Sequence, residues 1–222
     1  MTKAESKVID FIKKHILLFL LIAVTIIAIF LRVCGMDFQS DDFNSFLNSW
    51  WSIIKLNDFT GLATQVGNYN IPYQVIIYLM TLLPLNALYA YKIVSIIFDF
   101  VLAISTAMLV YSFAKNNRRL KAILTYSAVL LSTTVIFNSS FWAQCDSIYT
   151  SFIILAILFL HKDKPIASFV FIGIAFAFKL QTVFIIPVLL YYWISTKKIS
   201  ILHFFIIPAV DVIMCLPAII MG

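Results

Sequence analysis

The sequence predicts an all-α membrane protein, a polytopic transmembrane helical bundle with a loop on its outer face that carries short interfacial helices. Apolar residues make up 63% of the 222 residues and charged residues only 12%, which does not describe a water-soluble fold. Several apolar runs approach the roughly 20 residues that a helix needs to cross a bilayer, and none alternates as a transmembrane β-strand does. Basic residues, which give a net charge of +6, stand in clusters between these runs. Such clusters orient membrane helices, so nucleic acid is not the expected partner.

The first apolar run, Ile16 to Val33, is long enough to span a membrane and follows Lys3, Lys7, Lys13 and Lys14. A cleaved signal peptide also places basic residues before an apolar run, but it ends at a small-x-small cleavage site, and none follows here. We therefore expect a retained span with a cytoplasmic amino terminus.

Residues 36–72 form a polar and aromatic outer loop that contains the adjacent acids Asp41 and Asp42. Helical spacing predicts a short amphipathic helix along the membrane interface, with Trp50 and Trp51 at headgroup depth. Its expected apolar face consists of Phe43, Phe46, Leu47, Trp50, Trp51 and Ile54. Ser40 or Asp41 is expected to cap this helix, yet a cap needs only one acid. We therefore expect the acidic pair to form the centre of an active site.

Two further runs differ in length and in charge. The run from Pro72 to Leu83 has only 12 residues, too few to cross unaided, so it predicts a half-span or an interfacial hairpin. The run from Leu88 to Phe113 is of full length and carries Lys92 and Asp99, seven residues apart and so on one face. Charges at membrane depth face a cavity or a partner. Snorkelling from the interface is the alternative for Lys92.

Four basic clusters set the predicted topology: the amino terminus and residues 115–121, 162–164 and 197–198. They hold 12 of the 16 Lys and Arg. If all are cytoplasmic, the short run at Pro72 does not cross and the later apolar runs cross alternately. These later runs are Leu120–Phe137, Ile148–Leu160, Ile166–Phe178, Thr182–Ile194 and Ile199–Ile220.

This topology brings three polar segments to the outer face: the Asp41 and Asp42 loop, the segment from Asn138 to Asp146, and the corner from Lys179 to Gln181. A plain interhelical loop also explains the composition of the second segment. The corner is flanked by apolar segments of only about 13 residues, which bring it down towards the bilayer. A lysine there suits an anion at the lipid surface, such as a phosphate.

Five short motifs stand in these segments and beside them. They are Ser40-Asp-Asp-Phe43 with Phe46, Leu47 and Trp50, Tyr69-Asn-Ile-Pro-Tyr73, Lys92 with Phe98-Asp99, Asn138-Ser-Ser-Phe-Trp-Ala-Gln-Cys-Asp-Ser-Ile-Tyr149, and Phe178-Lys-Leu-Gln181. Together they resemble the bacterial integral-membrane glycosyltransferases of the GT-C fold, and most closely those grouped with the second mannosyltransferase of GPI-anchor assembly. The resemblance covers nearly the whole chain. The family usually has Gly where this chain has Ala143, a mild departure.

The resemblance implies a GT-C-like bundle in the cell membrane that transfers a mannose-like hexose from a polyprenyl-phosphate donor, with inversion. The acceptor is a glycan or a lipid on the outer face. Residues 1–222 then form a single transmembrane domain. The family's chains are much longer and this one stops inside an apolar run at Gly222, so we expect the amino-terminal portion of a longer enzyme or a truncated product.

The motif matches also imply roles for individual residues. Asp42 matches the family's acid and is expected to be the general base, ahead of Asp41. Lys179 is expected to meet the charge that develops on the leaving phosphate, with support from amide side chains. The full expected substrate-binding set, in which the aromatic rings supply apolar surface for the prenyl chain or a sugar, is Lys179, Gln181, Asn138, Trp142, Gln144, Asp146, Tyr69, Tyr73 and Lys92.

Two other functions remain open at this stage. A transporter or flippase for a lipid-linked sugar would also place charges at membrane depth, but its usual mark is an inverted repeat, and the sequence shows no internal repeat. A noncatalytic membrane subunit is the other alternative, and the early stop at Gly222 is its main support. Cys34, Cys145 and Cys215 are far apart in sequence and are expected to be small apolar fillers. The sequence assigns no metal site and no cofactor, and it leaves the need for a divalent cation open.

Overall fold

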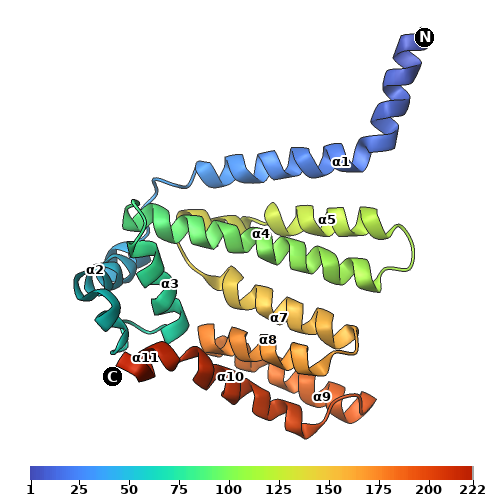
Figure 1. Ribbon diagram of the computed structural model, residues 1–222. Helices are drawn as coiled ribbons and strands as arrows, with labels where there is room; N and C mark the ends of the chain where they lie inside the picture. The colour runs from blue at the N-terminus through green and yellow to red at the C-terminus, as the bar shows by residue number, and fades with distance from the viewer. Residues whose placement is uncertain (222) are drawn as a thin grey trace.

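The computed structural model describes residues 1–221, and every regular element in that range is a helix, which confirms the all-α prediction (Figure 1). The α-helices are α1 (Lys3–Val33), α2 (Asn48–Asn57), α3 (Ile71–Thr81), α4 (Ala87–Phe113), α5 (Arg118–Leu130), α6 (Thr133–Ile136), α7 (Asp146–His161), α8 (Pro165–Phe178), α9 (Ile186–Thr196), α10 (Ile206–Met214) and α11 (Leu216–Met221). Two π-helical segments are η1 (Phe43–Leu47) and η3 (Phe137–Phe141), and three 3-10 segments are η2 (Asp58–Leu62), η4 (Leu180–Ile185) and η5 (Ile201–Phe205).

The longer helices lie side by side in a row, in the order α1, α5, α4, α7, α8 and α10 (Figure 1). Helices α2 and α3 lie across one end of the row, at the left in Figure 1, and α11 reaches the same end. The apolar interior has three parts: one under α2 and α3, one among α7 to α10, and one among α1, α4 and α5. Each part is built where the apolar stripes of neighbouring helices meet.

Local sequence signals explain several helix boundaries. Thr2 and Glu5 form a capping box at the start of α1, and Asn86 accepts a hydrogen bond from the backbone N–H of Tyr89 at the start of α4. Pro72 stands in the first turn of α3, where a proline is tolerated because the first-turn N–H groups have no partner inside the helix. Together with the stop after Thr81, this makes α3 the short helix that the sequence predicts.

Two helices in the described range, α1 and α4, are long and apolar enough to cross a membrane. The expected run Leu120–Phe137 is not one straight helix: α5 ends near Leu131, and the helical segment Thr133–Phe141 that follows is bent from it by 50°. Counting this bent pair as one span gives three. The bend lies at Ser132, whose backbone is extended, so the α5 hydrogen-bond ladder stops there.

The later runs are also shorter or more broken than predicted. Helices α7 and α8 have 16 and 14 residues, fewer than a straight span needs. The expected helix Thr182–Ile194 begins with the 3-10 segment η4, and Ile199–Ile220 is divided into η5, α10 and α11. The first turns of the α-helical pieces contain Pro187, Pro208 and Pro217. Because proline has no backbone N–H, the helical hydrogen-bond ladder cannot continue through these positions from the preceding segment.

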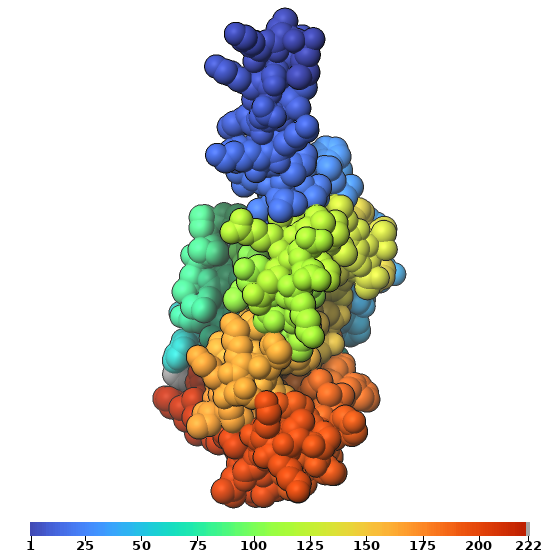
Figure 2. Space-filling model, turned by 90° about the vertical axis from the view of Figure 1, so that its right-hand side faces the viewer, coloured from blue at the N-terminus to red at the C-terminus, as the bar shows by residue number. Residues whose placement is uncertain are grey.

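The basic loops gather at the end of the row away from α2 and α3. The connections after α4, α7 and α9 meet there, and Figure 2 shows them together on one face. Lys198 Nζ donates to Asp163 Oδ1 over 2.8 Å, which ties two of these connections together. The Lys198 ammonium lowers the pKa of this exposed carboxyl group.

A buried ion pair joins the C-terminal end of α1 to the middle of α4. Arg32 Nε donates to Asp99 Oδ2 over 2.8 Å, and the residues are 1% and 0% exposed. Ser139 and Ser147 each donate to the same carboxylate over 2.5 Å. Arg32 also donates to the carbonyl oxygen of Leu130 over 3.0 Å. This cluster supplies the buried partner that the sequence required for Asp99.

We predict that Asp99→Asn destabilises the protein by about 3–5 kcal/mol, because it leaves the buried Arg32 cation without its counter-charge. The measurement is thermal unfolding in detergent. Arg32→Met combined with Asp99→Asn should recover part of the loss, and Lys198→Gln, which breaks the exposed pair with Asp163, should melt like wild type. An Asp99→Asn protein as stable as wild type would contradict the prediction.

Candidate functional site

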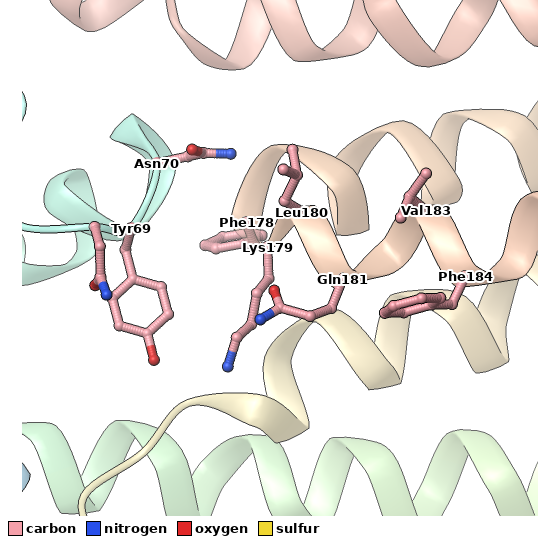
Figure 3. Close-up of a pocket in the computed structure, with 9 residues that line it drawn as sticks. Tyr69, Asn70, Phe178, Lys179, Leu180, Gln181, Val183 and Phe184 are labelled. Carbon is pink, nitrogen blue, oxygen red and sulfur yellow. The ribbon is translucent and has the colours of Figure 1, made fainter.

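Two neighbouring cavities open at the end of the row where α2 and α3 lie. The acidic cavity has a volume of about 380 Å³ and is lined by Asp42, Phe46, Leu47, Trp50, Asn68, Tyr69, Asn138, Trp142, Gln144 and Asp146. The corner cavity has a volume of about 520 Å³ and is lined by Asn68, Tyr69, Asn70, Phe178, Lys179, Leu180, Gln181, Val183 and Phe184 (Figure 3). Asn68 and Tyr69 belong to both linings, so the cavities adjoin.

Ser40 caps the helical segment that carries the acidic pair, so neither acid is needed as the cap. Its Oγ accepts a hydrogen bond from the backbone N–H of Phe43 over 3.1 Å and donates to the carbonyl oxygen of Trp142 over 3.2 Å. Of the two expected capping residues, Ser40 and Asp41, Ser40 is therefore the cap. The Asp42 carboxylate instead points into the acidic cavity, while Asp41 is exposed and is not among the residues that line it.

The apolar face of the predicted interfacial helix packs on protein. Trp50 and Trp51 are buried, with ring centroids 5.5 Å from Tyr69 and 6.0 Å from Tyr91. Tyr69 and Tyr91 thus cover the two tryptophans, whose position at headgroup depth stays a prediction. Phe46 does not share this burial: it is 53% exposed and lines the acidic cavity. The remaining predicted face, Phe43, Leu47 and Ile54, is buried.

The second polar segment is partly helical. The π-helical segment η3 runs through Asn138, and the chain then turns at Ala143, whose φ of 57° is in the left-handed region. This conformation favours glycine, so the alanine here has an unfavourable backbone conformation. The turn directs Gln144 towards Asp42, and the backbone N–H of Gln144 donates to the carbonyl oxygen of Asn138 over 2.8 Å.

A line of hydrogen bonds connects Tyr69, Gln144 and Asp42 in the lining of the acidic cavity. The Tyr69 hydroxyl donates to Gln144 Oε1 over 2.9 Å, and Gln144 Nε2 donates to Asp42 Oδ2 over 2.8 Å. Burial raises the pKa of Tyr69 well above its usual value, so the phenol keeps the proton that it donates. The Gln144 amide is thus fixed with its N–H towards the carboxylate. Side chains up to 102 positions apart in sequence meet here.

A second group of polar contacts stands at the boundary with the corner cavity. Lys179 forms an ion pair with Asp146 Oδ1, and Asn138 Nδ2 donates to Asp146 Oδ2 over 2.8 Å. The Lys179 ammonium also lies 5.3 Å from the ring centroid of Tyr69 and 5.6 Å from that of Tyr149. Lys179 therefore has a protein partner, and a ligand anion in the corner cavity would share it with Asp146.

The Lys-Leu-Gln corner presents two polar side chains to one side. Lys179 has an extended backbone that ends α8, and the 3-10 segment η4 begins at Leu180. In Figure 3 the Lys179 and Gln181 side chains extend towards the space beside Tyr69, whereas Leu180 points away from it. Phe178 and Phe184 supply the aromatic part of the lining.

Most of the predicted site residues line one cavity or the other, but Asp41, Lys92 and Tyr73 do not. Lys92 is buried, and its ammonium group donates to the backbone carbonyl oxygens of Gly35, Met36 and Phe38, so it neither snorkels nor faces a ligand. Tyr73 is also buried and packs behind Tyr69, with ring centroids 4.9 Å apart. The sequence-based assignment of Lys92 and Tyr73 to the substrate site is corrected accordingly.

The sequence reasoning missed Asn68, which lines both cavities, and Tyr149, which faces Lys179. The sequence feature that could have revealed Asn68 is the glycine before it, Gly67. Gly67 has φ of 81°, and a Cβ atom there would lie 2.2 Å from the Trp50 ring. A glycine is needed for both reasons. It turns the chain so that Asn68 and Tyr69 reach the boundary between the cavities.

The cysteines and the potential metal ligands are further side chains that could have a role in the site. Cys145 is buried beside the acidic cavity, and burial raises the pKa of its thiol to about 11, which fits a small apolar filler. Cys34 is exposed and does not fill the interior. Within residues 1–221, no group of three or more His, Cys, Asp or Glu side chains is arranged to hold a metal ion.

No known protein family, no curated protein and no solved structure matches this chain.

Proposed function

We propose that the protein is a membrane glycosyltransferase that moves a hexose from a polyprenyl-phosphate donor to a hydroxyl of a glycan or lipid acceptor, with inversion. The observation that carries the proposal is the pair of adjoining cavities, one lined by Asp42 and the other by Lys179 and Gln181. This reaction needs a base for the acceptor and cationic or amide groups for the leaving phosphate. The resemblance of the motifs around these residues supplies the reaction class.

In this proposal the acceptor enters the acidic cavity. Asp42 takes the proton of the acceptor hydroxyl as its oxygen attacks the anomeric carbon of the donor. The bond from that carbon to the phosphate oxygen breaks on the opposite face, and the leaving phosphate keeps the electron pair. Gln144 holds Asp42 through Oδ2, which leaves Oδ1 to face the hydroxyl. Trp142 and Trp50 line the same cavity and offer rings against which a sugar packs.

The donor phosphate enters the corner cavity. Lys179 stabilises the charge that develops on the phosphate, and Gln181 donates hydrogen bonds to it. The pairing of Lys179 with Asp146 holds the ammonium in place before the donor arrives, because Asn138 fixes the other oxygen of the same carboxylate. Phe178 and Phe184 contact the first part of the prenyl chain.

We further propose that the cavity end faces the outside of the cell. The support is the gathering of the basic loops at the opposite end of the row, because Lys and Arg are concentrated in the cytoplasmic loops of membrane proteins. Helices α1 and α4 then cross the membrane, and the shorter helices α7 to α10 pack beside them as broken or tilted spans.

Asp42→Asn is expected to lower the rate of sugar transfer by about 100-fold to 10,000-fold, the usual loss when one general base is removed. The amide keeps the size of the side chain and the bond to Gln144 in one of its orientations, so expression should be unchanged. Transfer is measured by mass spectrometry with a panel of polyprenyl-phosphate sugars. Asp41→Asn is the matched control and should stay active. Full activity of Asp42→Asn with loss in Asp41→Asn would assign the base to the neighbour.

Lys179→Met is expected to weaken donor binding strongly while the protein still folds, because methionine keeps much of the apolar stem without the charge. The comparison is donor affinity and melting temperature of Lys179→Met, Asp146→Asn and wild type. Asp146→Asn frees the lysine, so it should bind the donor at least as tightly as wild type. If Lys179→Met melts at a lower temperature but binds the donor normally, its only role is the ion pair with Asp146.

The orientation is tested with single cysteines in a chain whose exposed Cys34 has been replaced by alanine. A cysteine at Asn57, beside the cavities, should react with an impermeant thiol reagent in intact cells, and a cysteine at Asn117, in the basic loop after α4, should not. Both positions are exposed, so access to the reagent depends on the membrane side. The reverse pattern would place the cavities on the cytoplasmic side.

A further inference from the structure

An apolar groove lies between α1, α4 and α5, away from both site cavities. Its volume is about 670 Å³. Helix α5 packs on both α1 and α4 and forms the floor of the groove. The groove is lined by Leu21, Thr25, Ile104, Ala107, Met108, Tyr111, Ser112, Arg118, Ala122, Ile123, Tyr126 and Lys162. The proposed reaction uses none of these residues.

The two ends of the groove differ in chemistry. At the inner end, the Thr25 and Tyr126 hydroxyls lie 3.0 Å apart and bond to each other, so they satisfy their own polar groups. At the outer end stand two exposed cations, Arg118 at the start of α5 and Lys162 directly after α7. Neither forms an ion pair with an acidic side chain of the described residues. The end of the groove thus holds two positive charges without a counter-charge from residues 1–221.

The Arg118 guanidinium is held in place. Its Nε donates to the carbonyl oxygen of Tyr111 over 3.0 Å, and its central carbon lies 4.7 Å from the Tyr111 ring centroid. These contacts occupy one edge and one face of the group. The two terminal nitrogens form no hydrogen bond within residues 1–221, and such a planar fork matches a phosphate.

The length of the groove fits one leaflet of a membrane. From Arg118 to Tyr126 the floor helix α5 advances about 12 Å at 1.5 Å per residue. Half of the hydrocarbon core of a bilayer measures about 15 Å. An acyl chain that enters beside Arg118 therefore runs along apolar side chains to about the middle of the membrane.

We propose that this groove binds one acyl chain of an anionic membrane phospholipid, with the headgroup phosphate between Arg118 and Lys162. Two cations from separate helix ends at the mouth of an apolar groove match the two parts of such a lipid, its charge and its chain. Basic residues that only orient the protein in the membrane would not need an apolar groove beside them. The inference rests on the membrane placement proposed above and is independent of sugar transfer.

The experiment uses the full chain reconstituted in zwitterionic phosphatidylcholine vesicles. Phosphatidylglycerol with the same acyl chains is titrated in, and retained lipid is counted by native mass spectrometry after release from the membrane. Arg118→Gln with Lys162→Gln is compared with Lys115→Gln with Lys121→Gln, two basic residues of the neighbouring stretch that do not line the groove. Ala122→Phe, which fills the groove without changing charge, is the third variant.

The wild-type chain is expected to retain phosphatidylglycerol in preference to phosphatidylcholine. The Arg118 and Lys162 variant should bind it about 30-fold more weakly, since each cation near an anionic lipid contributes about a factor of five. The control pair should bind like wild type, and Ala122→Phe should lose the lipid.

Three results would overturn the inference. One is equal retention of the two lipids by wild type, and another is equal loss in the control pair. The third is release of the lipid by inorganic phosphate alone, which would leave the groove without a role. A chain that fails to enter the vesicles at all would instead refute the membrane placement, whereas an embedded chain without lipid preference refutes only the lipid site.

Discussion

The buried ion pair between Arg32 and Asp99 is the interaction on which the rest of the structure depends. A lone charge at that depth is costly, so the carboxylate must be surrounded by donors, and these come from three separate parts of the chain. Two of them, Ser139 and Ser147, each stand next in sequence to a site residue, Asn138 and Asp146. The pair that joins α1 to α4 therefore also fixes the position of the acidic cavity.

Lys92 plays the same part for the loop that carries the acidic pair. It stands two helical turns from Asp99 on α4, and it binds the short turn after α1 through the carbonyl oxygens of Gly35, Met36 and Phe38. Buried carbonyl groups need donors, and an ammonium group supplies three. The two buried charges of α4 thus hold the segments before Asp42 and around Asp146. Without these charges each segment would lose buried hydrogen bonds that define its position, and apolar contact is less specific in position.

The sequence predicted the helical class, the short α3 and the meeting of three polar segments, because composition, run length and charge placement act locally or through a few simple rules. It did not predict what Lys92 binds, since a lysine in an apolar run has several partners within reach of its long side chain. It did not predict that Tyr69 and Tyr91 cover Trp50 and Trp51, because amphipathic spacing defines an apolar face but not what covers it. The break at Ser132 was missed because apolar residues continue on both sides. The turn at Ala143 was invisible because alanine gives no sign of a left-handed conformation.

The charged side chains at the cavity end are distributed between two adjoining cavities. Lys179 is paired with Asp146, so the net charge at the boundary is balanced before any ligand arrives. Asp42 is met by the neutral amide of Gln144 on Oδ2, and no side chain of the described residues donates to Oδ1. A carboxylate held by a cation on each oxygen would be a weaker base, whereas a cation nearby stabilises a negative charge that develops on a phosphate. Asp42 and Lys179 stand in neighbouring cavities with Tyr69 between them, an arrangement that suits the two parts of the proposed transfer.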